Sequence, residues 1–294
     1  MTLLLMAAGS GSRYGKLKQF DDLGPNGEFL MEFSIYDAIK NGFNHIVIVT
    51  KSENQKFLKN YFKEKIDSSI KLDILAQKVD DIPQNSSFNG IRNKPWGTAH
   101  AVWTARNVIK SLFVIINADD YYGQRAFKGA SNFIKSENKS NKFALIGYKL
   151  KDTLSNHGTV SRGICTVKNN NLDSIIEKTK IIKKNNTITD IESGFTLNSN
   201  STVSMNFWIC NTKIFEYTEQ YFSTFLNDSN NHEKNEIYLP FVIHEMMKNK
   251  LISVEVINTE SQWFGVTYYN DKEVATKTLN KLVKQGKYPV ELWN

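Results

Sequence analysis

Near-continuous apolar runs, separated by segments with helical spacing, constrain the fold of this chain more than any other feature. The runs at 45–50 (HIVIVT) and 112–117 (LFVIIN) show no alternation with polar residues, and residues 3–6 are equally apolar. Such runs are typical of strands covered on both faces, whereas a strand with one wet face alternates. We expect further strands at 72–76, 143–150, 203–209 and 252–257, and helices at 30–40, 53–65, 98–109, 124–134, 212–226, 234–248 and 271–286. Strands that alternate with helices predict a mostly parallel sheet with helices on both faces.

The pattern changes between residues 157 and 203. Strands there are short and polar, with turn signals at 168–171 and 185–186. This pattern predicts a small antiparallel lobe. Because no linker rich in Pro, Gly or Ser separates the parts, we predict one domain over 1–294, with the lobe inserted and residues 212–294 in the same unit.

Composition narrows the class of protein. At 40% hydrophobic and 23% charged residues, the chain is an ordinary globule rather than a disordered one. No apolar run approaches the ~20 residues of a membrane span, and the mean hydropathy is −0.40, so we expect no membrane partner. Glycine follows the apolar start at once, which argues against a signal peptide. Cys165 and Cys210 lie far apart, which favours a reduced, cytoplasmic location.

The formal net charge of +7 has several possible interpretations. It can indicate a surface that binds nucleic acid, a site for an anionic small ligand, or only a solvated lysine-rich surface. The lysines are scattered, and no run of five basic residues occurs. We therefore expect no nucleic-acid partner.

The strongest local signal is the glycine-rich segment that follows the first predicted strand. Gly9, Gly11 and Gly15 allow the backbone N–H groups to approach phosphate oxygens closely. Arg13 adds a planar guanidinium suited to a polyphosphate, and Lys18 adds a second cation. A turn that merely needs glycines is the simpler alternative, and the two cations make it less favoured.

Two common phosphate loops do not fit this segment. A Walker loop requires Ser or Thr after Gly-Lys, but Leu17 follows Gly15 and Lys16. A dinucleotide fingerprint requires its third glycine one residue earlier, and an acidic residue where Thr50 and Lys51 stand. If the segment binds phosphate, it is therefore neither of these two loops.

Several motifs together resemble the sugar-phosphate nucleotidyltransferases of the nucleotide-diphospho-sugar transferase superfamily. Their signature LAAGxGTR, followed by a Lys-Gln pair, is similar to residues 5–13 and 18–19. Further similarities, in the family's order, lie at 95–101 (PWGTAHA, a second nucleotide loop), 117–123 (NADDYYG, a metal motif), 176–178 (IEK, the E-K-P segment), 206–209 (NFWI) and 263–267 (WFGVT, the W-x-D-x-G turn). The resemblance implies a Rossmann-like three-layer α/β/α fold with a mixed sheet.

The resemblance also implies a reaction and a set of site residues. A phosphate of the acceptor attacks the α-phosphate of a nucleoside triphosphate, and pyrophosphate leaves. A phosphate monoester is largely dianionic at neutral pH, so no general base is needed. The implied nucleotide-binding residues are Ala8, Gly9, Gly11, Ser12, Gln77, Gly97 and Thr98; the catalytic residues are Arg13, Lys18 and Lys178; the acceptor-binding residues are Gly158, Glu177 and Asn206.

The implied cofactor is Mg²⁺. Asp119 follows a predicted strand, and carboxylates at the end of a parallel strand face the ligand crevice of an α/β sheet. The family's second metal aspartate has no counterpart at Phe264 or Gly265, and the next acid is Asp271. Either Asp271 reaches the site, or one aspartate suffices, or catalysis has been lost.

These departures keep several functions open. Ser12 stands for the usual threonine, and Thr179 stands where the family has proline after Lys178. The first hypothesis is a sugar-1-phosphate nucleotidyltransferase. The second is a cytidylyltransferase for phosphocholine or a similar ester, and the third is a silent regulator that binds nucleotide sugars. A glycosyltransferase would need a D-x-D motif, which Asp119 and Asp120 lack. Family members often form dimers or tetramers, so a homo-oligomer is compatible with the resemblance.

Overall fold

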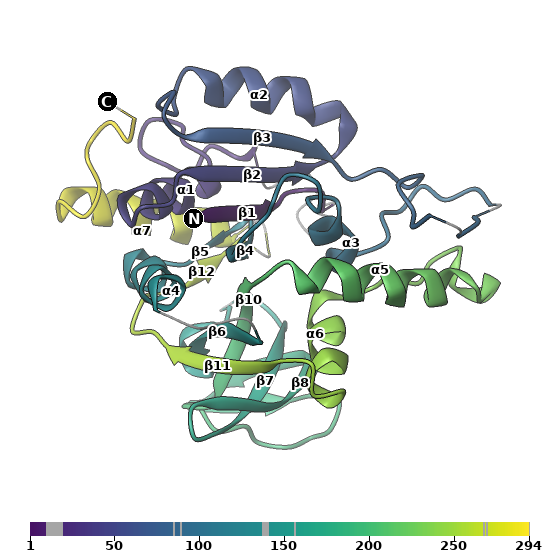
Figure 1. Cartoon of the computed structure of the whole chain (residues 1–294). Helices are drawn as coiled ribbons and strands as arrows, with labels where there is room; N and C mark the ends of the chain where they lie inside the picture. Colours follow the sequence, from purple (N-terminus) through teal and green to yellow (C-terminus); the bar gives the residue numbers. More distant parts are fainter. Residues whose placement is uncertain are drawn as a thin grey trace.

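The computed structural model describes residues 1–9, 20–84, 86–88, 90–136, 141–155, 157–266, 268 and 270–293. Most of the strands form one sheet in the order β3-β2-β1-β4-β10-β6-β11-β8-β7, with β9 beside β8 (Figure 1). The strands are β1 (Thr2–Met6), β2 (His45–Thr50), β3 (Lys71–Ala76), β4 (Phe113–Asn117), β5 (Asp120–Tyr121), β6 (Lys142–Lys149), β7 (Val160–Lys168), β8 (Asn171–Lys184), β9 (Thr187–Asp190), β10 (Thr202–Cys210), β11 (Ser253–Asn258) and β12 (Phe264–Gly265). The α-helices are α1 (Leu30–Lys40), α2 (Gln55–Lys63), α3 (Thr98–Trp103), α4 (Gln124–Lys135), α5 (Lys213–Leu226), α6 (Leu239–Lys248) and α7 (Asp271–Lys284). None of the helices that the structure describes is long and apolar enough to cross a lipid bilayer.

Strand β1 lies at the centre of the parallel half of the sheet. It pairs in parallel with β2 on one edge and β4 on the other, and β2 pairs in parallel with β3. Leu3 and Leu5 pack with residues of α1, α2 and α4, whereas Leu4 packs with residues of α3, α5 and α6. Because both faces are covered, the apolar runs do not alternate, and the predicted α/β fold with helices on both faces is confirmed.

The predicted antiparallel lobe is formed by β7, β8 and β9. Two turns join these strands, and their Asn-Asn pairs at 169–170 and 185–186 all have positive φ. Asparagine tolerates this left-handed conformation better than most residues, which explains the two turn signals. The lobe continues the main sheet rather than forming a second one, because β8 pairs with β11 and β7 pairs with β10.

The largest differences from the predicted helices lie in α3 and α6. The helix expected over 98–109 ends at Trp103, and turns follow in which Ala105 and Arg106 bond to carbonyls three residues earlier. The helix expected over 234–248 begins only at Leu239. Pro240 stands in its first turn, where the missing N–H costs no hydrogen bond.

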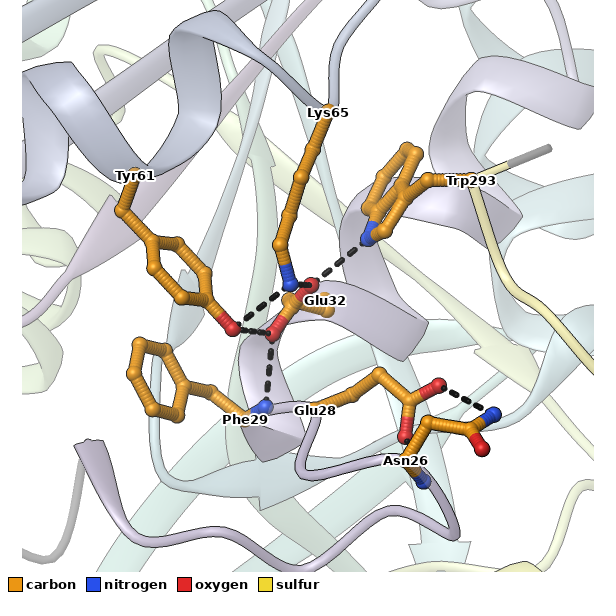
Figure 2. Close-up of polar contacts among 7 residues, drawn as sticks. All are labelled: Asn26, Glu28, Phe29, Glu32, Tyr61, Lys65 and Trp293. Atoms are coloured by element: carbon orange, nitrogen blue, oxygen red, sulfur yellow. Dashed lines mark hydrogen bonds and ion pairs between the residues drawn. The ribbon is translucent and has the colours of Figure 1, made fainter.

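A buried carboxylate joins α1 to α2 and to the C-terminal segment. The side chain of Glu32 is inaccessible to solvent, and four donors surround it (Figure 2). They are Phe29 N at 2.7 Å, Tyr61 Oη at 2.6 Å, Lys65 Nζ at 3.0 Å and Trp293 Nε1 at 2.6 Å. A buried charge is tolerated when it is paired and hydrogen-bonded, so this one group fixes three segments together.

We predict that Glu32→Ala destabilises the protein strongly, because it leaves the Lys65 charge and three further donors without their acceptor. The expected loss is about 3 kcal/mol of unfolding free energy, measured by urea denaturation. Glu28→Ala is the matched control, since among the described residues the carboxylate of Glu28 accepts only from Asn26. Equal losses in the two variants would contradict the role of Glu32.

A second buried acid lies at the other side of α1. Asp37 is 1% exposed, and its Oδ2 accepts a hydrogen bond from Tyr288 Oη at 2.7 Å. Tyr288 Oη also lies 2.8 Å from Tyr121 Oη. Burial raises the pKa of Asp37 to about 8, and the hydrogen bond from Tyr288 acts against that shift. The folded protein therefore keeps this carboxyl protonated at neutral pH.

This pKa predicts a pH dependence of stability. Between the unfolded pKa of about 3.9 and the folded pKa, the folded state binds one proton more than the unfolded state. Stability should therefore fall as pH rises from 5 to 8, with a limiting slope of about 1.4 kcal/mol per pH unit from this group. In Asp37→Asn the contribution disappears, and urea titrations at several pH values should show a flatter profile. Parallel profiles for the two proteins would disprove the assignment.

Candidate active site

A cleft of about 1620 Å³ opens where the strands of the parallel half end. In open α/β sheets this edge is the usual place for a ligand. Its walls come from the segments after β1, β2, β3 and β4 and from strands β7, β8 and β10. The lining includes Ala8, Gly9, Lys51, Gln77, Gly97, Thr98, Asp119, Asp120, Arg162, Gly163, Glu177 and Asn206. One continuous space therefore joins the parallel half to the antiparallel lobe.

The predicted phosphate segment enters the cleft directly from β1. The Ala7 N–H donates to Val49 O at 2.7 Å, which carries the pairing of β1 one residue past its end. Ala8 and Gly9 then line the cleft. The other predicted residues of this segment, Gly11, Ser12, Arg13 and Lys18, lie outside the described residues.

Gln77, Gly97 and Thr98 lie together at one end of the cleft. Gln77 follows β3, and its Nε2 donates to Gly97 O at 3.0 Å. Gly97 has a φ of +103°, and a Cβ there would lie 2.5 Å from Ile237 O, so only glycine fits. Thr98 Oγ1 accepts from Leu239 N at 2.9 Å, which fixes the start of α3 against α6.

Two adjacent carboxylates lie in the cleft after β4. Asp119 is half-buried, and Asp120 is buried with its Oδ2 accepting from Asn117 Nδ2 at 2.9 Å. Asp120 pairs with Gly265 of β12, and a Cβ on Gly265 would lie 2.3 Å from Asp120 Oδ1. The carboxylate of Asp120 therefore occupies the space that a side chain at 265 would need. Phe264 and Gly265 are the residues in the region where the resemblance implies a second metal aspartate.

The donor set of this region fits Mg²⁺. Mg²⁺ binds through one or two carboxylates and completes its shell with phosphate oxygens and water. Asp119 and Asp120 supply two carboxylates on one wall of the cleft. No group of three or more acids, histidines and cysteines that could hold a metal gathers among the residues described. A magnesium ion here would therefore depend on phosphate oxygens for part of its shell.

The antiparallel lobe brings Glu177 and Asn206 to the cleft. Burial raises the pKa of Glu177, and the nearby Arg162 opposes that shift. Asn206 has a φ of 59° and lies where the pairing of β10 with β6 is interrupted between Ser204 and Trp208. The irregular backbone turns this asparagine toward the cleft, which it lines.

Arg162 and Gly163 line the cleft too, and neither was predicted from the sequence. Gly163 pairs with Glu177 across the β7–β8 hairpin. Lys168 pairs with Asn171 at the turn, and a regular hairpin counted back from that pair would place residue 162 opposite Glu177. The register shifts by one residue between Thr166 and Val167, so the partner of Glu177 is residue 163. The turn signal could have located the pair to within one residue.

Lys178 does not reach the cleft lining. Its neighbours Glu177 and Thr179 line the cleft, as alternation along a strand requires for residues two apart. The Nζ of Lys178 instead lies 3.0 Å from Oδ2 of the buried Asp190. On the antiparallel lobe, Arg162 is the only cation among the described residues that line the cleft.

Gly158 and Asp271 also lie outside the lining. A Cβ on Gly158 would lie 2.7 Å from Tyr268 Oη, so this glycine accommodates an aromatic ring. Asp271 begins α7, where its carboxylate accepts from Ser155 Oγ at 3.0 Å and from Tyr268 N at 2.7 Å. Asp120, rather than Asp271, is thus the second acid that the structure brings beside Asp119 in the cleft.

Comparison with known proteins agrees with this fold and cleft. Residues 3–274 match the nucleotidyl transferase family, so the chain belongs to that family and its reaction class is nucleotidyl transfer. No curated protein matches the sequence.

Solved structures share the fold at low sequence identity. The inositol-1-phosphate CTP transferase from T. maritima has a TM-score of 0.67 at 15% identity, over 96% of both chains. A putative glucose-1-phosphate thymidylyltransferase from Bacillus anthracis has a TM-score of 0.64 at 12% identity, over 95% of both chains. A UDP-glucose pyrophosphorylase from Acinetobacter baumanii has a TM-score of 0.61 at 16% identity, over 97% of this chain and 98% of that one.

The contact between Gly265 and Asp120 yields a prediction. In Gly265→Ala the new Cβ would lie 2.3 Å from Asp120 Oδ1 and 2.9 Å from Trp263 Cζ2, so Asp120 must move. We expect the rate of pyrophosphate release to fall at least about tenfold, the loss expected when a pre-positioned charge is displaced. Gly129→Ala in α4 is the control, since its nearest contact would be an ordinary 3.4 Å. An unchanged rate in Gly265→Ala would contradict a role for Asp120.

Proposed function

We propose that this protein is a Mg²⁺-dependent nucleotidyltransferase that joins a nucleoside triphosphate to a sugar 1-phosphate and releases pyrophosphate. The observation that carries the proposal is the single cleft described above. Gln77 and Gly97 line one end of this cleft. Asp119 and Asp120 line it after β4, and Glu177 lines it on the antiparallel lobe. Family membership supports the reaction class.

The reaction needs positioning rather than proton transfer. An oxygen of the acceptor phosphate attacks the α-phosphorus, the bond from that phosphorus to the bridging oxygen breaks in line, and pyrophosphate carries away the electron pair. Because the second pKa of a phosphate monoester is about 6, the nucleophile is already charged at neutral pH. The protein contributes by aligning two anionic substrates and neutralising their charge.

The nucleotide would lie across the parallel half of the cleft. Gln77 would bind the edge of the base, with Gly97 and Thr98 against its face. The backbone from Ala8 and Gly9 to Gly11 and Ser12 would bind phosphates, with Arg13 and Lys18 supplying charge. Asp119 and Asp120 would hold Mg²⁺, which neutralises phosphate charge when it is bound.

The acceptor would lie against the antiparallel lobe. Glu177 and Asn206 offer hydrogen-bond partners for free hydroxyl groups, which a sugar phosphate or a cyclic polyol phosphate has and phosphocholine does not. This difference favours a polyhydroxylated acceptor over phosphocholine. Arg162 lines the cleft near Glu177 and would add positive charge on the acceptor side, while its guanidinium itself donates to the backbone carbonyls of Thr153 and Ser161.

The proposal is tested by a matrix of four ribonucleoside triphosphates and thymidine triphosphate against several phosphate esters in Mg²⁺. The esters are glucose 1-phosphate, inositol 1-phosphate and phosphocholine, and the readout is pyrophosphate release with the product identified by mass. We expect turnover with a polyhydroxylated ester. Turnover with phosphocholine alone would show that the acceptor is not a polyhydroxylated ester and would contradict this part of the proposal. Triphosphate binding without any pyrophosphate release would instead support a silent regulator.

Asp119→Asn provides the sharpest prediction for this site. Replacing the carboxylate should lower kcat at least about 100-fold, because the charge opposite the phosphates is lost while the shape is kept. Asp152→Asn is the control, since Asp152 is exposed and outside the cleft lining. Both variants should unfold at the same urea concentration. Wild-type kcat in Asp119→Asn would refute the proposed role.

A further inference from the structure

His100 lies directly behind Gln77, in α3, and its side chain is inaccessible to solvent. Its two ring nitrogens contact different partners. Nε2 lies 2.9 Å from the backbone oxygen of Asp81, and Nδ1 lies 3.0 Å from Gln77 Nε2. A chain of hydrogen bonds therefore runs from the main chain at residue 81 to the amide that faces the cleft.

The tautomer of His100 follows from these partners. A backbone carbonyl can only accept, so Nε2 of His100 carries the hydrogen. Burial lowers the pKa of His100 to about 4, and Arg106 and Arg92 add to that shift against the opposing effect of Asp81. The ring is therefore neutral at pH 7, and its Nδ1 has no hydrogen and accepts one from Gln77.

The orientation of the Gln77 amide follows in turn. Its nitrogen lies 3.0 Å from two acceptors, His100 Nδ1 and Gly97 O, which engage both of its N–H groups. Turning the amide over would place its oxygen against two acceptors. No residue within the described part of the chain donates to Gln77 Oε1, so this oxygen is the group available to a ligand in the cleft.

We propose that His100 is a positioning residue that holds Gln77 as a pure hydrogen-bond acceptor, so that the site selects a nucleobase presenting an N–H at this point and rejects one presenting a carbonyl. This inference rests on the proposed function, in which Gln77 contacts the base. His100 itself touches no substrate. It keeps the N–H groups of Gln77 engaged, so that Gln77 can only accept a hydrogen bond from the base. A base that presents a carbonyl there finds no donor, and this difference creates the discrimination.

A purely structural role for His100 is the competing explanation. The ring lies 5.9 Å from Trp103 and 5.3 Å from Phe222 between centroids, so it also fills the core between α3 and α5. A residue that only fills space affects the stability of the protein. It does not affect the ranking of nucleotides by a folded protein, and the two roles therefore separate in a binding assay.

The test is a double-mutant cycle read out by equilibrium binding rather than turnover. Titration calorimetry with each nucleoside triphosphate in Mg²⁺ gives a Kd and a ratio between the best and worst base. We expect His100→Leu to weaken the best triphosphate about tenfold and to reduce that ratio about as much. In Gln77→Leu both effects should already be present, so His100→Leu in that background should add nothing.

The control is His45→Leu. His45 also has a partner at each ring nitrogen, Thr2 and Asp73, but it lies at the start of β2, at the end of the strand away from the cleft. It should leave every Kd unchanged. Additive effects, or a His100→Leu protein that ranks the bases as wild type does, would overturn the role of His100 while leaving the proposed function intact. A wild-type protein that binds no triphosphate would overturn both.

A measurement on the wild type covers the case in which His100→Leu does not fold. The ¹⁵N shifts of the histidine ring report which nitrogen carries the hydrogen. At pH 7 we expect the His100 signals of a neutral ring protonated at Nε2. Protonation at Nδ1, or at both nitrogens, would overturn the inference, because Gln77 would then have to present its oxygen to His100.

Discussion

The burial of β1 on both faces, together with its parallel pairing on both edges, determines where this protein can have a site. A strand enclosed in this way cannot contribute side chains to a surface along its length. The chain becomes available only where β1 ends, and there the segments after β1, β3 and β4 meet at one edge of the sheet. The residues with ligand-binding chemistry cluster at that edge because it is the first place where backbone groups are free to bind something else.

Much of this arrangement could be predicted from the sequence. The helix at 30–40 and the strand at 45–50 have the predicted bounds, because their apolar periodicity is strong and local. The Asn-Asn turns were also predictable, since few residues tolerate positive φ. The positions of Gln77, Asp119 and Glu177 in one cleft agree with the resemblance, although their roles stay predictions.

What could not be predicted depends on register and on distant contacts. The bulge after Thr166 decides that Gly163, and not Arg162, lies opposite Glu177, and no local signal marks a bulge. Lys178 and Glu177 were both expected to face the acceptor. Adjacent residues of a strand point to opposite faces, however, and Lys178 forms an ion pair with Asp190. The fit of Asp120 against Gly265 joins residues far apart in the sequence. It becomes visible only once β5 and β12 are placed side by side.

The pairing of the strands beyond β4 has a mechanical consequence. Strands β10, β6, β11, β8 and β7 follow one another in the sheet, and β7 returns to pair with β10, which itself pairs with β4 of the parallel half (Figure 1). The wall that carries Glu177 and Asn206 is thus joined to the central sheet by strand pairing. It cannot swing away from the central sheet without breaking strand pairing.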